Sequence, residues 1–260
     1  MTENEHGDSG SLVGARQLEA EGVIKQVSPP RAIMKLETWF LLIFLAAVTF
    51  IFGSQYLHLK KRTDAIYAYN EGARLRKERR WDQAIPHFDK AIELDLKLAA
   101  AFVGRAQSNS FLGRYEQAIQ DYDVAIRLEP GKPGLYLERG NTYHGLGDPK
   151  RAIKDFDKVI AIGRSYEHYA WTYVFRGTSY RNLGQHEQAI RDFSSAIRID
   201  PRLASAYVER GVTYLKQGKA SEAQTDFRKA REFSKGDSMA SEGVESAIAR
   251  AKQEEDERIK

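Results

Sequence analysis

The chain has 260 residues, of which 42% are hydrophobic and 29% are charged, a balance typical of a globular or repeat protein. It contains no cysteine, which excludes disulfides, thiolate-bound zinc and thiol catalysis. A formal net charge of +4 is too small to indicate a nucleic-acid-binding protein by itself.

Residues 1–37 are a polar N-terminal segment. Four basic and six acidic side chains give this segment a net charge of −2, and its apolar residues are sparse. Pro29 and Pro30 would break a helix there. We therefore expect residues 1–37 to be a disordered polar tail.

Residues 38–58 are predicted to form a transmembrane helix. Positions 38–57 are 20 residues without a charge, and at ~1.5 Å per residue they span about 30 Å, the thickness of the bilayer core. Trp39 and Tyr56 lie near the two ends, where membrane interfaces favour aromatic rings. One alternative for this segment is a buried core helix, but such a helix would not be apolar on every side in so small a domain. A cleaved signal peptide would need a shorter, less acidic leading segment and a better cleavage site than Phe52-Gly53-Ser54.

Residues 59–64 form a basic juxtamembrane linker that contains Lys60, Lys61 and Arg62. These cations, together with those of residues 73–81, would attract anionic lipid headgroups. The alternative interpretation, equally favoured, is an ordinary solvated helix end. Within 20 residues of the span, three cations precede it and six follow it. The positive-inside rule slightly favours a cytoplasmic C-terminal domain, although long domains are exported regardless of charge.

Five segments of similar sequence follow within residues 65–237. In each, an alanine stands twelve positions after a small residue, and an aromatic residue follows the alanine by four. Each column keeps the same intervals of 34, 34, 37 and 34 residues. The columns are Gly72, Ala106, Gly140, Gly177 and Gly211; Ala84, Ala118, Ala152, Ala189 and Ala223; and Phe88, Tyr122, Phe156, Phe193 and Phe227.

This pattern resembles the tetratricopeptide repeat (TPR), in which Leu-Gly-x-x-Tyr, Ala-x-x-x-Phe and Pro recur within 34 residues. Further matching positions are Phe102, Tyr136, Tyr173 and Tyr207; Tyr143, Tyr180 and Tyr214; and Pro130 and Pro201. The resemblance covers about two thirds of the chain and implies an all-α fold, a helix-turn-helix solenoid. Gly113, Gly147, Gly184 and Gly218 fall in the turns, where a left-handed backbone suits glycine.

The predicted organisation has nine parts. They are the tail (1–37), the transmembrane helix (38–58), the linker (59–64), five TPRs (65–98, 99–132, 133–166, 170–203 and 204–237) and a C-terminal capping helix (238–260). Ser238 is the predicted N-cap of the last helix, whose apolar face carries Val244, Ala247, Ile248 and Ala251.

An arginine column and an aspartate column disappear together from the first repeat, which carries Glu71 and His87 in their places. In an antiparallel helix pair the two columns lie at similar height, so we interpret them as structural ion pairs. The pairs are Arg105 with Asp121, Arg139 with Asp155, Arg176 with Asp192, and Arg210 with Asp226. Partly exposed pairs of this kind contribute at most ~1 kcal/mol each, and two independent solvated columns are the alternative.

Two departures mark particular repeats. The first repeat has Ala68 where an aromatic residue is expected, and Arg79 replaces its turn glycine, as suits an end repeat. A three-residue insertion around residues 163–169 separates the third and fourth repeats, with Arg164 in place of proline. We expect a longer second helix or an altered stacking angle at the insertion.

No motif for catalysis or cofactor binding is recognisable in the sequence. The nearest approach to a phosphate loop, residues 211–221, has six residues between its glycines instead of four, and Ala220 replaces the magnesium-binding hydroxyl residue. The six histidines lack metal-ligand spacing. We therefore predict a non-enzymatic protein with no cofactor, no metal and no nucleic-acid partner.

In TPR domains, the first helix of each pair generally lines a concave surface that holds a peptide or a partner helix. The resemblance thus implies a candidate peptide-binding groove, with packing between neighbouring helices as the alternative role of its residues. The groove residues are Tyr69, Val103, Gln107, Phe111, Leu137, Asn141, His144, Val174, Thr178, Val208 and Val212.

The Lys, Asn and Arg clamp with which some TPR domains hold acidic chaperone tails is not recognisable here. Tyr69, Ala73, Val103, Leu137 and Asn141 occupy the relevant columns. The sequence predicts a single-pass, membrane-anchored scaffold that binds a protein or peptide partner. The alternatives are a self-associating envelope-organising or chaperone-like protein with an exported domain, and the regulatory subunit of an enzyme.

Overall fold

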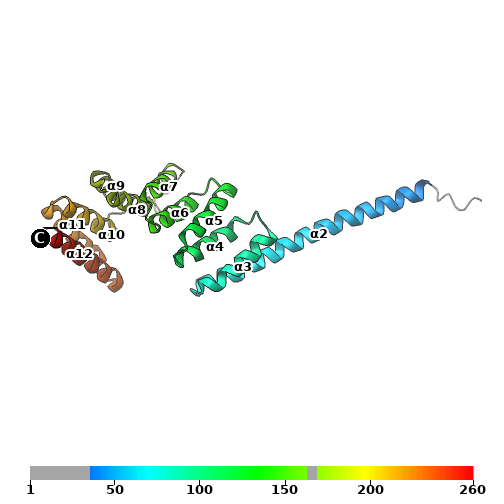
Figure 1. Ribbon diagram of the computed structural model, residues 1–260, viewed down its shortest axis with the longest axis horizontal. Coiled ribbons are helices and arrows are strands. Elements are labelled where there is room, and N and C mark those ends of the chain that lie inside the picture. The colour runs from blue at the N-terminus through cyan, green and yellow to red at the C-terminus, as the bar shows by residue number, and fades with distance from the viewer. Residues whose placement is uncertain (1–35, 163–168, 260) are drawn as a thin grey trace, which may run out of the picture. The chain divides into compact units, whose positions relative to one another are not determined.

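A computed structural model describes residues 36–162 and 169–259 of the chain (Figure 1). These residues form eleven α-helices joined by turns, and no strand occurs among them. The chain divides into two compact units, Met1–His58 and Leu59–Lys260. The predicted disordered tail falls almost wholly outside the described residues, as does the insertion at 163–168 with Arg164.

Helix α2 (Leu36–Lys77) contains the predicted transmembrane segment. Between Thr38 and His58 all of its side chains except the half-buried Val48 are exposed, including Phe40 at 66% and Phe52 at 67%. No residue of its most apolar 18-residue window is buried inside the protein. By length and composition this helix is able to cross a membrane, whereas a core helix of a soluble domain would be mostly buried.

The second unit consists of antiparallel helix pairs in chain order. Its first pair is formed by the C-terminal part of α2 with α3 (Trp81–Leu94). Three-residue turns, as between Phe111 and Tyr115, connect the helices of a pair. The remaining helices are α4 (Ala99–Phe111), α5 (Tyr115–Leu128), α6 (Pro133–Gly145), α7 (Pro149–Ile162), α8 (Tyr169–Asn182), α9 (His186–Ile199), α10 (Ala204–Lys216), α11 (Ala220–Ser234) and α12 (Ser238–Ile259).

The turn within each pair requires one residue in the left-handed region of backbone space. The second to fifth pairs place a glycine there, with φ between 74° and 81°: Gly113, Gly147, Gly184 and Gly218. The first pair uses Arg79 with a φ of 59°. A non-glycine residue in this conformation costs about 1–2 kcal/mol, so the first turn is strained where the other four are not.

Each pair is held closely together by a small residue on the first helix and an aromatic ring on the second. A Cβ added to Gly140 would lie 2.7 Å from Phe156 Cε1, closer than van der Waals contact permits. The ring positions of the repeats are almost completely buried, at 0–2% exposure: Phe88, Tyr122, Phe156, Phe193 and Phe227. Absence of a side chain on one helix therefore makes room for the ring of the other.

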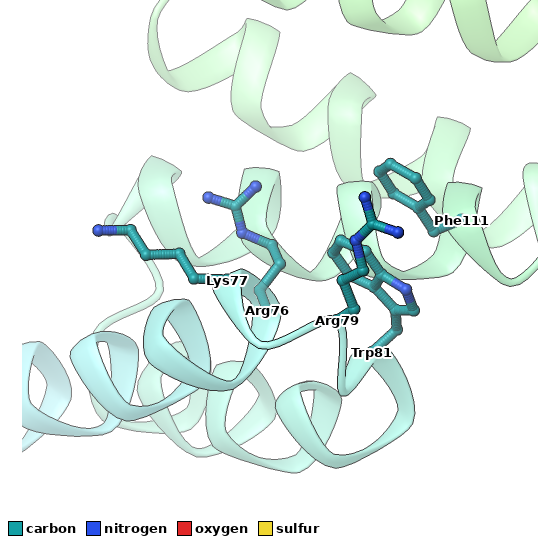
Figure 2. Close-up of a pocket in the computed structure, with 5 residues that line it drawn as sticks. All are labelled: Arg76, Lys77, Arg79, Trp81 and Phe111. Atoms are coloured by element: carbon teal, nitrogen blue, oxygen red, sulfur yellow. The ribbon is translucent and has the colours of Figure 1, made fainter. Parts of the chain in front are cut away.

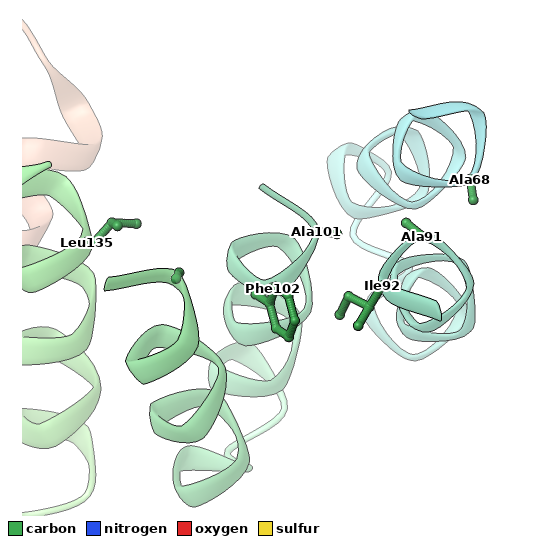
Figure 3. Close-up of a cluster of buried hydrophobic side chains, with 7 residues drawn as sticks. Ala68, Ala91, Ile92, Ala101, Phe102 and Leu135 are labelled. Atoms are coloured by element: carbon green, nitrogen blue, oxygen red, sulfur yellow. The ribbon is translucent and has the colours of Figure 1, made fainter. Parts of the chain in front are cut away.

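Packing continues from one pair to the next. One cluster joins Ala68 of α2, Ala91 and Ile92 of α3, Phe102 of α4 and Leu135 of α6 (Figure 3). Burial shared in this way between consecutive pairs means that no single pair has to form a core by itself.

Helix α12 covers the last pair. Val244 and Ile248 are 7% and 2% exposed and pack against Val208 of α10 and Phe227 of α11. Its N-cap differs from the prediction: Asp237 Oδ1 accepts a hydrogen bond from the Ala240 backbone N–H at 3.0 Å, and Ser238 is the first helical residue. Asp237 caps the helix because its carboxylate lies one residue earlier, where it reaches the unpaired N–H groups.

The longer second helix or altered stacking angle expected at the insertion concerns residues 163–168, which lie outside the described residues. Up to Ile162 the described part of α7 has 14 residues, as many as α5 and α9. Val159, which replaces an alanine of the repeat, is 5% exposed and fits the core of its pair.

Candidate protein-binding site on the first helices

Four arginines of the first helices form two-pronged ion pairs inside their own repeats. Arg139 donates from Nε to Asp155 Oδ2 at 2.8 Å and from Nη2 to Asp155 Oδ1 at 2.7 Å. The carboxylate side chain is 6% exposed and the arginine 18%. The same geometry, with N–O distances of 2.6–2.8 Å, occurs in Arg105–Asp121, Arg176–Asp192 and Arg210–Asp226.

Each of these arginines also contacts the preceding repeat. Arg139 Nη1 donates to Asp123 Oδ1 of α5 at 2.5 Å. The sequence interpretation missed this second partner, although it always stands directly after the aromatic residue of the preceding second helix. The other contacts of this kind are Arg105–Asp89, Arg176–Asp157 and Arg210–Ser194.

Aromatic rings enclose the arginine column. The Arg139 guanidinium lies 5.8 Å from the ring centroids of both Tyr136 and Tyr143. Arg176 lies 5.4 Å from the Tyr173 ring and 5.8 Å from the Tyr180 ring. These contacts hold the arginine side of α4, α6, α8 and α10 against aromatic rings, so other side chains are presented on the opposite face of each helix.

That other face carries the candidate groove residues, and the structure separates them by burial. Val174 and Val208 are each 4% exposed and pack in the cores of the fourth and fifth pairs, so the structure leaves them unavailable to a ligand. Phe111 is 69% exposed at the end of α4. The remaining candidates are half-buried: Tyr69, Val103, Gln107, Leu137, Asn141, His144, Thr178 and Val212.

Several of the half-buried apolar candidates also pack between helices. The Tyr69 ring lies 6.0 Å from the Phe88 ring, and Leu137 packs on the cluster around Phe156. Val212 packs on the cluster that α12 completes. The apolar stripe predicted from sequence is thus narrower in the structure.

Polar contacts run along this face from helix to helix. Ser110 of α4 hydrogen-bonds to Thr142 of α6 at 3.2 Å, and the His144 ring lies 3.4 Å from the Ser179 hydroxyl of α8. Arg181 of α8 donates to the Glu209 backbone carbonyl of α10 at 3.3 Å. The first helices are therefore linked side by side into one continuous surface.

Two ionisable groups on this surface are shifted by burial. Burial raises the pKa of Glu138, against the opposing effect of a hydrogen bond from Gln107. Burial also lowers the pKa of His144, with the positive charge of Arg181 acting in the same direction. Both shifts favour the neutral form, so the middle of the face is less charged than its sequence suggests.

A pocket of about 490 Å³ lies at one edge of this surface (Figure 2). Its lining comes from the end of α2, the first turn, the start of α3 and the end of α4: Arg76, Lys77, Arg79, Trp81 and Phe111. The Trp81 and Phe111 rings stack with centroids 4.2 Å apart and planes 3° from parallel. We refer to these five residues as the edge pocket. Of the sequence-predicted groove, only Phe111 belongs to it.

Among the described residues, no three His, Asp or Glu side chains come together as a metal site.

Family comparison identifies the repeats. A model described as "TPR repeat" matches residues 112–147 and 177–218, and one described as "Tetratricopeptide repeat" matches 133–166 and 204–235. Together with the helix pairs, these matches establish that the chain contains tetratricopeptide repeats in an all-α TPR solenoid. No curated protein sequence matches the chain.

Solved structures of the same fold are numerous. A MamA structure is 23% identical with a TM-score of 0.59, covering 66% of this chain and 92% of its own. YrrB, titled a TPR protein with an unusual peptide-binding site, is 23% identical with a TM-score of 0.58, covering 74% and 97%. PilW, titled a type IV pilus biogenesis factor, is 18% identical with a TM-score of 0.61, covering 75% and 91%. At these identities the likeness concerns the fold.

Proposed function

We propose that this protein is a membrane-anchored scaffold that binds a partner protein through the face of its first TPR helices. The observation that carries the proposal is the half-buried amide of Asn141 at the centre of that face. Among the described residues the Asn141 amide has no hydrogen-bond partner. Leu137 and His144 lie on either side of it on the same helix. A ligand backbone would satisfy such an amide, as extended and helical peptides do in related recognition modes.

The fold supports a binding role. YrrB, which shares the fold, is described as having a peptide-binding site, and TPR solenoids present extended surfaces rather than enclosed catalytic clefts. We expect the protein to act without catalysing a reaction, because its repeat architecture engages its most buried carboxylates in structural pairs such as Arg139–Asp155.

Helix α2 supports the anchor, since an exposed apolar segment of this length is stable in a bilayer and costly in water. Lys60, Lys61 and Arg62 follow the proposed span and are exposed, as contact with anionic headgroups requires. The excess of cations after the span favours a cytoplasmic TPR domain.

Site-specific photo-crosslinking tests the binding face. A photoreactive amino acid at Gln107 or Asn141 is expected to yield a discrete crosslinked protein from membranes of the source cells. The matched controls are Gln117 and Gln120 of α5, which are exposed on a second helix. Equal crosslinks from the two helices would contradict binding on the first-helix face.

Cysteine accessibility tests the anchor and its orientation. Lys235→Cys introduces a single cysteine into a chain that has none, at an exposed position. With a cytoplasmic TPR domain, a membrane-impermeant maleimide labels it only after cell lysis, and the protein stays in the membrane after a carbonate wash. Labelling of intact cells would assign the domain to the exported side. Release by carbonate would contradict the anchor itself.

A further inference from the structure

The edge pocket differs from the corresponding position of every later repeat junction. The repeat spacing aligns Trp81 and Phe111 with Tyr115 and Gly145 at the next junction. There the tyrosine ring lies over the bare glycine, and a Cβ on Gly145 would meet Tyr115 Cε1 at 3.0 Å. At the third junction the aligned residues are Pro149 and Asn182, and at the fourth they are His186 and Lys216. A stacked aromatic pair therefore occurs at the first junction alone among these four.

Exposure makes this pair unusual as a structural contact. Phe111 is 69% exposed even though it stacks on Trp81, so the stack buries only part of its ring. A ring placed for packing alone would be covered, as Phe88 of the first repeat is at 0% exposure. The exposed ring face is available to an apolar group of a ligand.

Cations surround the aromatic pair. Arg76 and Lys77 project from the last turn of α2, and Arg79 lies beside Trp81 and Phe111 (Figure 2). Within the described part of the chain, none of the three forms an ion pair, because Glu71 and Glu78 are engaged by Arg74 and Arg80. The buried Nε of Arg76 also has no hydrogen-bond acceptor in the structure. The positive charge of Arg76 acts on the partly buried Glu138, whose pKa burial raises, whereas Lys77 and Arg79 have no ion-pair partner among the described residues. The pocket therefore presents donors and an excess of positive charge.

The backbone conformation of Arg79 is a third, independent indication that the edge pocket has a binding role. Four of the five turns meet the left-handed requirement with glycine, and only the first uses a residue that is strained there, with a φ of 59°. Glycine would relieve that strain but would remove the guanidinium from the pocket. Strain retained where a simple alternative exists indicates that the side chain has a task.

We propose that the edge pocket binds an acidic segment of a partner protein, in which carboxylates flank an aromatic side chain. The carboxylates pair with Arg76, Lys77 and Arg79, and the aromatic side chain packs on the exposed face of Phe111. A lipid headgroup would satisfy the cations but leave the aromatic wall in water. The site rests on the proposed function only in that its ligand is a protein, and its five residues do not include Gln107 or Asn141.

Trp81 itself can report the binding. Trp39→Phe and Trp171→Phe leave Trp81 as the only tryptophan of the full chain, which is studied in detergent micelles. The probe is an acetylated Asp-Glu-Phe-Asp-Glu-Phe peptide amide. The comparison peptides replace phenylalanine by alanine, or every acid by lysine. We expect the acidic aromatic peptide to change Trp81 fluorescence saturably and to bind about tenfold or more tightly than either comparison peptide.

The decisive variant is Arg79→Gly. It is expected to raise the Tm by about 2 °C, since strain is relieved, and to weaken peptide binding about tenfold. Phe111→Ala tests the aromatic wall with little risk to folding because that ring is largely exposed. The matched control is Arg127→Gln, an exposed arginine of α5, which should leave binding unchanged.

Three outcomes would overturn the proposal. One is unchanged peptide affinity in Arg79→Gly, which would make Arg79 a mere irregularity of the end repeat. Another is equal binding of the alanine or lysine peptide. The third is a Trp81 response to phosphatidylglycerol vesicles without a response to the acidic peptide, which would assign the pocket to the membrane surface. Crosslinks from position 141 report on the middle of the first-helix face, and Trp81 fluorescence reports on the edge pocket, so each proposal is able to fail without the other.

Discussion

Arg139 and Asp155, sixteen residues apart in the chain, face each other in a two-pronged ion pair with N–O distances of 2.8 and 2.7 Å. The arginine uses its remaining nitrogen to reach Asp123 of the preceding repeat. One guanidinium thus joins three helices, α5, α6 and α7. Planar, bidentate geometry of this kind requires arginine, since a lysine ammonium would satisfy only one of the carboxylates well.

A double-mutant cycle on Arg139→Met and Asp155→Asn should show strong coupling. Both side chains are mostly buried, so we expect a coupling energy of about 1.5–3 kcal/mol, above the ~1 kcal/mol typical of exposed pairs. Urea denaturation of the four proteins measures it. Coupling below ~0.5 kcal/mol would mean that water screens the pair despite its burial.

Replacing Ser194 with aspartate should stabilise the junction between the fourth and fifth repeats. The Ser194 hydroxyl accepts from Arg210 Nη1 at 2.9 Å, where the three other arginines of the column meet a carboxylate. The gain should be about 0.5–1 kcal/mol, because the acids at the other junctions are 40–51% exposed. Ser195→Asp, one residue further along α9, is the control and should give no gain.

Gly140→Ala should destabilise the third repeat by about 1–3 kcal/mol. Its new methyl group would lie 2.7 Å from the Phe156 ring, in a core that cannot expand freely. Gly134→Ala, in the same helix, meets nothing within 4 Å. This control should be neutral or stabilising by up to about 1 kcal/mol, since alanine favours helix. Thermal denaturation of both variants distinguishes a steric cause from a general intolerance of substitution in α6.

Glu138→Gln should change how stability depends on pH. Because burial raises the Glu138 pKa, the folded chain keeps this proton to a higher pH than the unfolded chain does. Its contribution is full below the ordinary value of 4.5 and is lost as the pH rises through the raised pKa. The glutamine variant cannot lose that proton, so its Tm should exceed that of the natural chain at pH 7 and match it near pH 4.

The control for this experiment is Glu116→Gln, which alters an exposed carboxylate of α5. Its Tm should follow that of the natural chain across the whole pH range. Identical pH profiles for Glu138→Gln and the natural chain would contradict burial of the Glu138 carboxylate as the cause of the shift.

The helix pairs could be predicted from sequence because a repeated constraint leaves a repeated residue. Gly140 recurs as Gly177 and Gly211 since every pair needs room for one ring, and Gly147 recurs as Gly184 since every turn needs the same backbone. Joint loss of arginine and aspartate from the first repeat similarly indicated their pairing. The second partner, Asp123, escaped notice because its column changes to Ser194 at the last junction.

The candidate binding residues were harder to predict because periodicity gives the face of a helix but not what covers that face. Val174 and Val208 share a column with Leu137, yet they are almost fully buried whereas Leu137 is half-buried. Their burial depends on how far neighbouring helices extend over them, and α12 adds a cover that no repeat position specifies.

The sequence by itself determined the repeat, the turns, the apolar span and the ion pairs within the second to fifth repeats, since all of these depend on local spacing. Only the tertiary structure decided that Trp81 and Phe111, thirty residues apart, stack beside Arg76 and Arg79 and leave a pocket. Contact between consecutive repeats depends on the angle at which they stack. That angle is set by many side chains at once and leaves no periodic mark on the sequence.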